Sequence, residues 1–177
     1  GRPAELPGVE EQIGLFINTL PVICAPRSEQ SVAEWIEQVQ ASNLALREFE
    51  HTPLYDVQRW AGLGGEALFD TLVVFESYPV SEALKQGAPG GLQFGDVGIQ
   101  EQTNYPLTLL VSLGETLSIQ YRHDLARWNP ATLQQVARHL SHLLQAMAQD
   151  AGQVLGELPL FDADEQQQIV QGWNPRH

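Results

Sequence analysis

One uninterrupted apolar segment, residues 68–75, constrains the fold more than any other part of this sequence. Its residues, L-F-D-T-L-V-V-F, place apolar side chains on both faces of an extended chain. Such a pattern is typical of a central strand in a sheet that is covered above and below. Because helical and strand-like segments alternate along the chain, we expect an α/β fold.

Three segments have the apolar spacing of helices. The first, residues 32–49, has Ser28 or Ser31 as its N-cap residue. The second, residues 54–60, follows a proline and ends at a group of glycines. The third, residues 130–147, opens with an Asn-Pro pair that is typical of a helix start, and its apolar stripe lasts four turns. These three segments supply the predicted helical layer.

Two further segments have the alternation of strands. Apolar residues occupy every second position in residues 107–113 and again in residues 117–121. The pair Gly114-Glu115 between them suits a two-residue type II′ turn. We therefore predict a β-hairpin here.

The composition limits the classes of partner. The 177 residues, 43% of them apolar, are enough for one globular domain or one lobe of a larger domain. A formal net charge of −13 disfavours binding to nucleic acid and to anionic membranes. The single cysteine, Cys24, cannot form an internal disulfide, and no leader or membrane-spanning run is visible. We expect a soluble, cytoplasmic protein.

Two polar residues interrupt strand-like segments. Asn18 lies in the β-branched and aromatic run of residues 13–21, and Asp70 lies within residues 68–75. A buried polar group without a partner costs about 1–3 kcal/mol. Asn18 should therefore be hydrogen-bonded locally or face a polar cleft. Ligands of α/β proteins bind at strand ends, which makes Asn18 a candidate site residue. Asp70 should be paired with a neighbouring loop or help to shape a cleft.

The other candidates for chemistry carry little signal. His139 and His142 lie on one helix but point away from its apolar stripe, which favours a solvated face over a metal site. His123 and Asp124 are adjacent at a strand end, where neighbouring side chains face opposite sides. The nucleophile elbow G-x-S-x-G, the P-loop and the dinucleotide-binding glycine pattern are absent, so nucleotide binding is unsupported. No metal site is expected.

Four stretches, in order, resemble the second half of a condensation domain of non-ribosomal peptide synthetases. They are G-R-P with E-L-P-G in residues 1–8, I-G-L-F-I-N-T-L-P in 13–21, L-F-D-T-L-V-V-F-E in 68–76 and T-N-Y-P-L-T-L in 103–109. The resemblance implies a chloramphenicol-acetyltransferase-like lobe with a mixed central sheet flanked by helices. Residues 1–157 would form the C-terminal lobe, and residues 158–177 would begin the linker toward an adenylation domain.

The resemblance also implies an activity. In this family, a tunnel between two lobes receives the phosphopantetheine arms of two carrier-protein domains. A donor acyl or peptidyl thioester then forms an amide bond with an acceptor aminoacyl thioester. Family catalysis centres on an H-H-x-x-x-D-G motif, which these residues lack. The fragment would therefore need the N-terminal lobe of the same domain, and it would bind no cofactor directly.

The resemblance assigns site residues as well. Asn18 matches the family asparagine that lines the tunnel near the reacting centre, and Gly14, Phe16 and Thr19 match its neighbours in the motif. Residues 78–98, rich in glycine and proline, stand where the family has a latch between the lobes.

Two alternatives stay open. The first is an epimerisation domain, which shares the fold but carries a G-W-F-T-type word where this chain has Leu15 and Asn18. The second is a non-catalytic lobe that docks carrier proteins, which is consistent with the acidic composition and the missing histidine motif.

Overall fold

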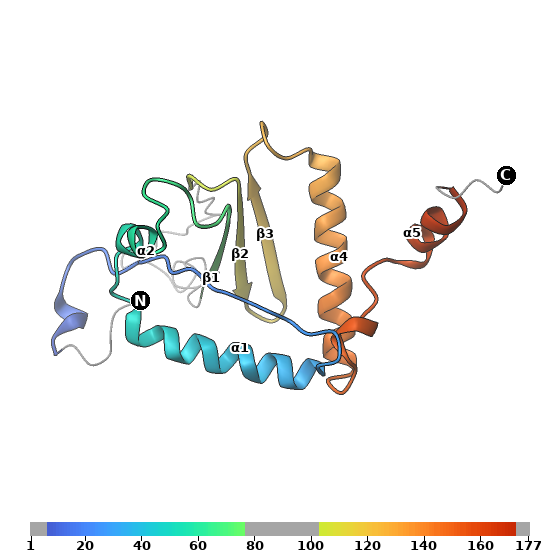
Figure 1. The fold of residues 1–177 in the computed structure, drawn as a ribbon, viewed down its shortest axis with the longest axis horizontal. Helices are drawn as coiled ribbons and strands as arrows, with labels where there is room; N and C mark the ends of the chain where they lie inside the picture. The colour runs from blue at the N-terminus through green and yellow to red at the C-terminus, as the bar shows by residue number, and fades with distance from the viewer. Residues whose placement is uncertain (1–6, 77–102, 173–177) are drawn as a thin grey trace, which may run out of the picture. The chain divides into compact units, whose positions relative to one another are not determined.

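The computed structural model of the chain describes residues 7–76 and 103–172 (Figure 1). The region expected to form a latch, residues 78–98, lies outside these ranges, as do most of the first motif and residues 173–177. We call residues 158–177 the tail. The chain divides into two units, one formed by residues 69–132 and the other by residues 1–68 together with 133–177. We describe each unit by itself.

The smaller unit contains a three-stranded mixed sheet. Its strands are β1 (Thr71–Glu76), β2 (Leu107–Leu113) and β3 (Leu117–His123), in the order β1-β2-β3. β1 runs parallel to β2, with Val73 opposite Leu109, and β3 runs antiparallel to β2. Together with the helices of the larger unit, this sheet confirms the predicted mixed α/β class.

The centre of the sheet differs from the prediction. β2 is the middle strand of the three, and it contains the buried Thr108 and Leu110. β1 has one neighbour among the described strands, and its Val73 and Phe75 side chains are exposed. The expectation of a doubly covered central strand over residues 68–75 is therefore wrong for the described residues of this unit. An apolar run indicates that a strand needs cover, but it does not indicate how many strands pair with it.

Two of the motif stretches meet in this unit. The ring of Phe69, from the L-F-D stretch, stacks on the ring of Tyr105, from the T-N-Y-P stretch, with centroids 5.2 Å apart. The hydroxyl groups of Thr103 and Thr108 form a hydrogen bond of 2.6 Å, which satisfies the fully buried Thr108. These contacts fix the chain as it enters β2.

The hairpin between β2 and β3 forms as predicted, but its turn is different. Leu113 pairs with Leu117, so the loop comprises the three residues from Gly114 to Thr116. The Gly114 N–H donates to the Thr116 carbonyl at 3.2 Å. A type II′ turn requires a left-handed glycine, whereas Gly114 does not have a positive φ.

The larger unit is mainly helical. Its elements are η1 (Val9–Glu11), α1 (Val32–Leu46), η2 (Arg47–Phe49), α2 (Leu54–Trp60), α4 (Pro130–Gln149), η3 (Leu155–Glu157), α5 (Ala163–Gln167) and the π-helical turn η4 (Gln168–Gly172). The first turn of α4 belongs to the smaller unit. All three predicted helices are present. No helix in the described ranges is long and apolar enough to cross a membrane.

The helix ends follow the predicted caps. Ser31 caps α1 in a capping box, in which its hydroxyl oxygen accepts from the Glu34 N–H and the Glu34 carboxylate accepts from Ser31. The hydrogen bonds from the Ser31 backbone and hydroxyl hold the pKa of Glu34 below its ordinary value. The Asn129 side chain accepts from the Ala131 N–H at 2.8 Å and so caps α4. These caps are local, which is why the sequence predicts them.

A set of backbone hydrogen bonds joins the start of α1 to the chain that follows α4. We call residues 28–33 and 151–156 together the clasp. Its bonds are Val32 N to Gln153 O (2.9 Å), Ala33 N to Ala151 O (2.8 Å), Leu155 N to Gln30 O (2.8 Å) and Gly156 N to Ser28 O (2.9 Å). The first amides of a helix have no partner within the helix. Here they are satisfied by carbonyls that come much later in the sequence.

Candidate functional site

Residues 13–21, which contain the candidate site, form an extended segment that belongs to no β-ladder of the described residues. Ile13, Leu15 and Ile17 are 103%, 86% and 79% exposed. The expected strand therefore does not form among the described residues, and these side chains are not buried there. The alternation of side chains is the one expected of a strand, but a strand also needs a hydrogen-bonding neighbour.

Asn18 is the polar exception in this segment, and it is hydrogen-bonded. Its side-chain Nδ2 donates to the Glu50 carbonyl at 2.8 Å and to the Thr52 carbonyl at 2.7 Å. We call this pair of bonds the amide bridge. The expected hydrogen bonding is confirmed, although the partners lie 32 and 34 residues later in the sequence. Asn18 itself is exposed.

The amide bridge holds a short turn between η2 and α2. Within this turn the Glu50 N–H donates to Arg47 at 3.2 Å and the Thr52 N–H donates to Phe49 at 2.9 Å. The turn ends at Pro53, which precedes α2 and cannot donate a backbone hydrogen bond. The amide bridge thus links the extended segment to this turn across the surface of the unit.

The bridge also fixes the orientation of the Asn18 carboxamide. An amide nitrogen carries two hydrogens, and here both point to carbonyl oxygens. The flipped orientation would place the amide oxygen against those carbonyls and would be repulsive. Toward any further group, Asn18 can therefore offer only its Oδ1 atom, as a hydrogen-bond acceptor.

The other predicted site residues divide between the two units. Gly14 is exposed, whereas Phe16 and Thr19 are half-buried on the same segment as Asn18. A Cβ atom on Gly14 would lie 3.6 Å from the Phe16 ring, which is an ordinary contact. Asp70 lies in the other unit, immediately before β1, where it is exposed and accepts from the Thr71 hydroxyl at 3.3 Å. It is not the buried strand residue that the sequence predicted.

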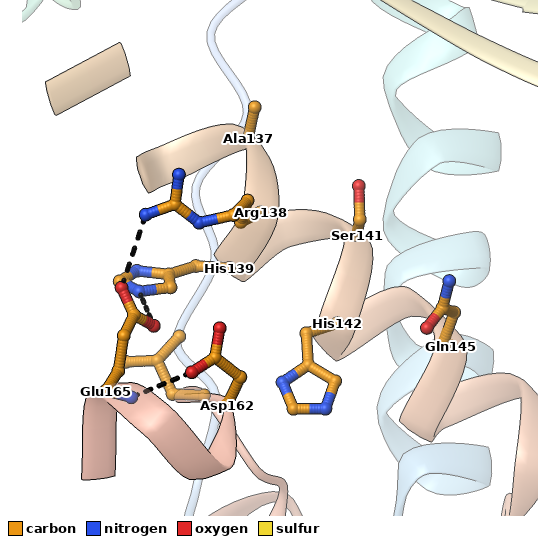
Figure 2. A pocket seen from close by; sticks show the side chains of 9 residues that line it. Ala137, Arg138, His139, Ser141, His142, Gln145, Asp162 and Glu165 are labelled. Atoms are coloured by element: carbon orange, nitrogen blue, oxygen red, sulfur yellow. Dashed lines mark hydrogen bonds and ion pairs between the residues drawn. The ribbon is translucent and has the colours of Figure 1, made fainter. Parts of the chain in front are cut away.

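A second polar site, which the sequence analysis missed, forms where the tail meets α4. The Glu165 carboxylate is bound by Arg138 at 3.5 Å and by His139 Nε2 at 2.9 Å (Figure 2). It also accepts a hydrogen bond from Gln135 Nε2 at 3.1 Å. The His139 ring also meets the edge of Phe161, with centroids 5.3 Å apart and planes at 83°. We call Glu165 and these three α4 residues the Glu165 cluster. It fastens the tail to the helix.

The Glu165 cluster corrects the expectation for His139. Both His139 and His142 are half-buried rather than on a solvated face. They line an open hollow of about 370 Å³ between α4 and the tail, together with Arg138, Asp162 and Glu165 (Figure 2). No group of three or more possible metal ligands gathers in the described ranges. The spacing of Gln135, Arg138 and His139 places them on one helix face, but that spacing does not identify a partner 26 residues beyond His139.

The Glu165 cluster lowers the pKa of Glu165. Partial burial raises the pKa, but the hydrogen bonds from His139 and Gln135 and the His139 charge outweigh that effect. A lowered carboxyl pKa means that attachment of the tail is fully present above the ordinary value of 4.5 and is lost as the pH falls through the lowered value. Attachment should therefore weaken in acid.

We expect Glu165→Gln to loosen the tail at neutral pH. The substitution removes the charge that pairs with Arg138 and replaces an acceptor oxygen of the cluster by a donor. Hydrogen exchange of the tail amides should become faster, whereas exchange in the clasp should not change. Asp164→Asn is the matched control, since Asp164 is exposed and next to Glu165. Equal exchange rates in the two variants would contradict an anchoring role for the Glu165 cluster.

Comparison with known proteins identifies the protein family to which the chain belongs. The Condensation domain family matches residues 1–170, which is nearly the whole chain. The chain therefore belongs to the condensation-domain family.

Named relatives agree with this membership. The chain is 41% identical to a linear gramicidin synthase component of Brevibacillus parabrevis over 98% of its own length and 2% of that protein. It is 34% identical to tyrocidine synthase 2 of the same species, covering 96% of this chain and 5% of the relative. It is 30% identical to surfactin synthase subunit 2 of Bacillus subtilis, covering 98% of this chain and 5% of the relative. The chain thus spans a small fraction of these peptide synthetases.

Proposed function

We propose that residues 1–157 form the C-terminal lobe of an amide-forming condensation domain in a non-ribosomal peptide synthetase. The observation that carries this proposal is the family match together with the I-G-x-F-x-N-T-x-P motif. Leu15 and Asn18 in that motif favour condensation over epimerisation. Residues 158–177 would lead into an adenylation domain.

In the proposed reaction, the amine of an acceptor aminoacyl thioester attacks the carbonyl of a donor acyl or peptidyl thioester. A C–N bond forms, the C–S bond breaks, and the proton of the amine passes to the departing thiol of the donor arm. Both substrates are carried by phosphopantetheine arms of carrier-protein domains. The companion N-terminal lobe supplies the H-H-x-x-x-D-G motif, which this chain lacks.

In this proposal the chain supplies one wall of the substrate tunnel. Gly14, Phe16, Asn18 and Thr19 line that wall near the reacting centre. Asn18 contributes to this wall through the amide bridge, which uses both of its N–H groups.

Reconstitution tests the proposal. This chain is joined to an N-terminal lobe that carries the histidine motif and is mixed with one donor-loaded and one acceptor-loaded carrier protein. We expect a new amide on the acceptor carrier, detected by mass spectrometry, and no product from this chain alone. Inversion of the stereocentre of the donor residue without formation of an amide would replace the proposal with epimerisation. Carrier binding without either product would replace it with a docking role.

A further inference from the structure

We propose that Asn18 is a positioning residue and that the turn Glu50–Thr52, which it holds, is part of the tunnel wall. This inference rests on the proposed function and adds a second chain segment to the site. The amide bridge carries it, because both hydrogens of the Asn18 amide are used by the carbonyls of Glu50 and Thr52. Removal of the Asn18 side chain therefore leaves those two carbonyls without their hydrogen-bond donor.

The amide bridge contributes little to the stability of the core. Asn18 is exposed, and its neighbours Ile13, Leu15 and Ile17 bury almost no surface in this unit. Carbonyls in such a place can be hydrated by water when Asn18 is removed. A hydrogen bond of this kind stabilises a protein by about 1 kcal/mol or less. The main effect of the amide bridge is therefore to fix the position of the turn Glu50–Thr52 at the surface of this unit.

The turn depends on this outside support. Its own bonds are the two short-range ones, Glu50 N to Arg47 O and Thr52 N to Phe49 O. The next helix begins without a side-chain cap at Pro53. Ordering each residue of such a turn costs roughly 1–2 kcal/mol of conformational entropy. The amide bridge holds the Glu50–His51 and Thr52–Pro53 peptide groups and so reduces the freedom of the whole turn.

A double-mutant cycle in the complete condensation domain tests the inference. Asn18→Asp keeps the shape of the side chain but removes both N–H donors. His51→Gly loosens the turn without changing Asn18 or the carbonyls that it binds, since the His51 side chain is exposed. Asn43→Asp, on the exposed face of α1, is the matched control for the added charge.

We expect Asn18→Asp to lower kcat by about 10-fold or more, because small misplacements of a site have large effects on rate. KM for the acceptor-loaded carrier should stay within about twofold, and hydrogen exchange around residues 47–54 should become faster. His51→Gly should reproduce part of the loss in kcat. If Asn18 acts through the turn, the double variant should be no slower than Asn18→Asp alone.

Two results would overturn the inference. One is a double variant whose loss equals the product of the single losses, because Asn18 would then act on the substrate independently of the turn. The other is faster exchange in Asn18→Asp with an unchanged kcat. Either result requires an active wild-type domain, whereas absence of product from the wild-type domain overturns the proposed function itself.

Discussion

Replacing Gly156 by valine should lower the free energy of unfolding by about 2–3 kcal/mol. A Cβ atom at this position would lie 3.0 Å from the Ser28 Cβ atom and 3.1 Å from the Ser28 carbonyl oxygen. Both neighbours belong to the clasp, and the Gly156 N–H donates to that same oxygen. A side chain therefore has to push the two halves of the clasp apart.

Urea denaturation of the chain measures this effect as a lower midpoint at an unchanged m-value. Gly64→Val is the matched control, because a Cβ atom there meets nothing within 4 Å and Gly64 does not have a positive φ. Its effect should stay within about 0.5 kcal/mol. Equal midpoints for the two variants would show that the clasp tolerates a side chain and would contradict the prediction.

The second large effect should appear in the reaction. In a complete condensation domain, Asn18→Ala should slow amide formation by about 10- to 100-fold, because both bonds of the amide bridge are lost and the turn Glu50–Thr52 is released. The melting temperature should fall by only a few degrees, since the carbonyls remain accessible to water.

Product formation and thermal unfolding are measured on the same samples, with Asn43→Ala as the control on an exposed helix face. Unfolding of the domain by Asn18→Ala would assign Asn18 to the stability of the lobe instead of to the reaction. An unchanged rate would remove Asn18 from the site.

The elements predicted correctly depend on neighbours in the sequence. The capping box at Ser31 and Glu34 and the Asn-Pro start of α4 are complete within a few residues. The strands of the hairpin also follow from their alternation. In contrast, contacts with distant segments decide the position of β1 in the sheet and the burial of residues 13–21. The apolar pattern of one segment does not encode those contacts.

The candidate site shows the same division. The cost of a buried, unpaired amide led to the prediction that Asn18 would be hydrogen-bonded; the hydrogen bonds are present, but Asn18 is exposed, so burial is not their cause. The identity of the acceptors was not predictable, because every residue has a backbone carbonyl and only the fold selects those of Glu50 and Thr52. His139 is a similar case, since its partner Glu165 follows in the tail. A helical spacing can place His139 on a face, but it cannot place the tail against that face.

The clasp has a consequence for synthesis and for engineering. A ribosome releases α1 long before residues 151–156, so the first amides of the nascent helix have to wait for carbonyls that are made about 120 residues later. The larger unit can therefore be completed only late in translation. For the same reason, a recombination junction in a hybrid synthetase should not fall between Ser28 and Gly156, because a cut there would give paired segments of the clasp different parents.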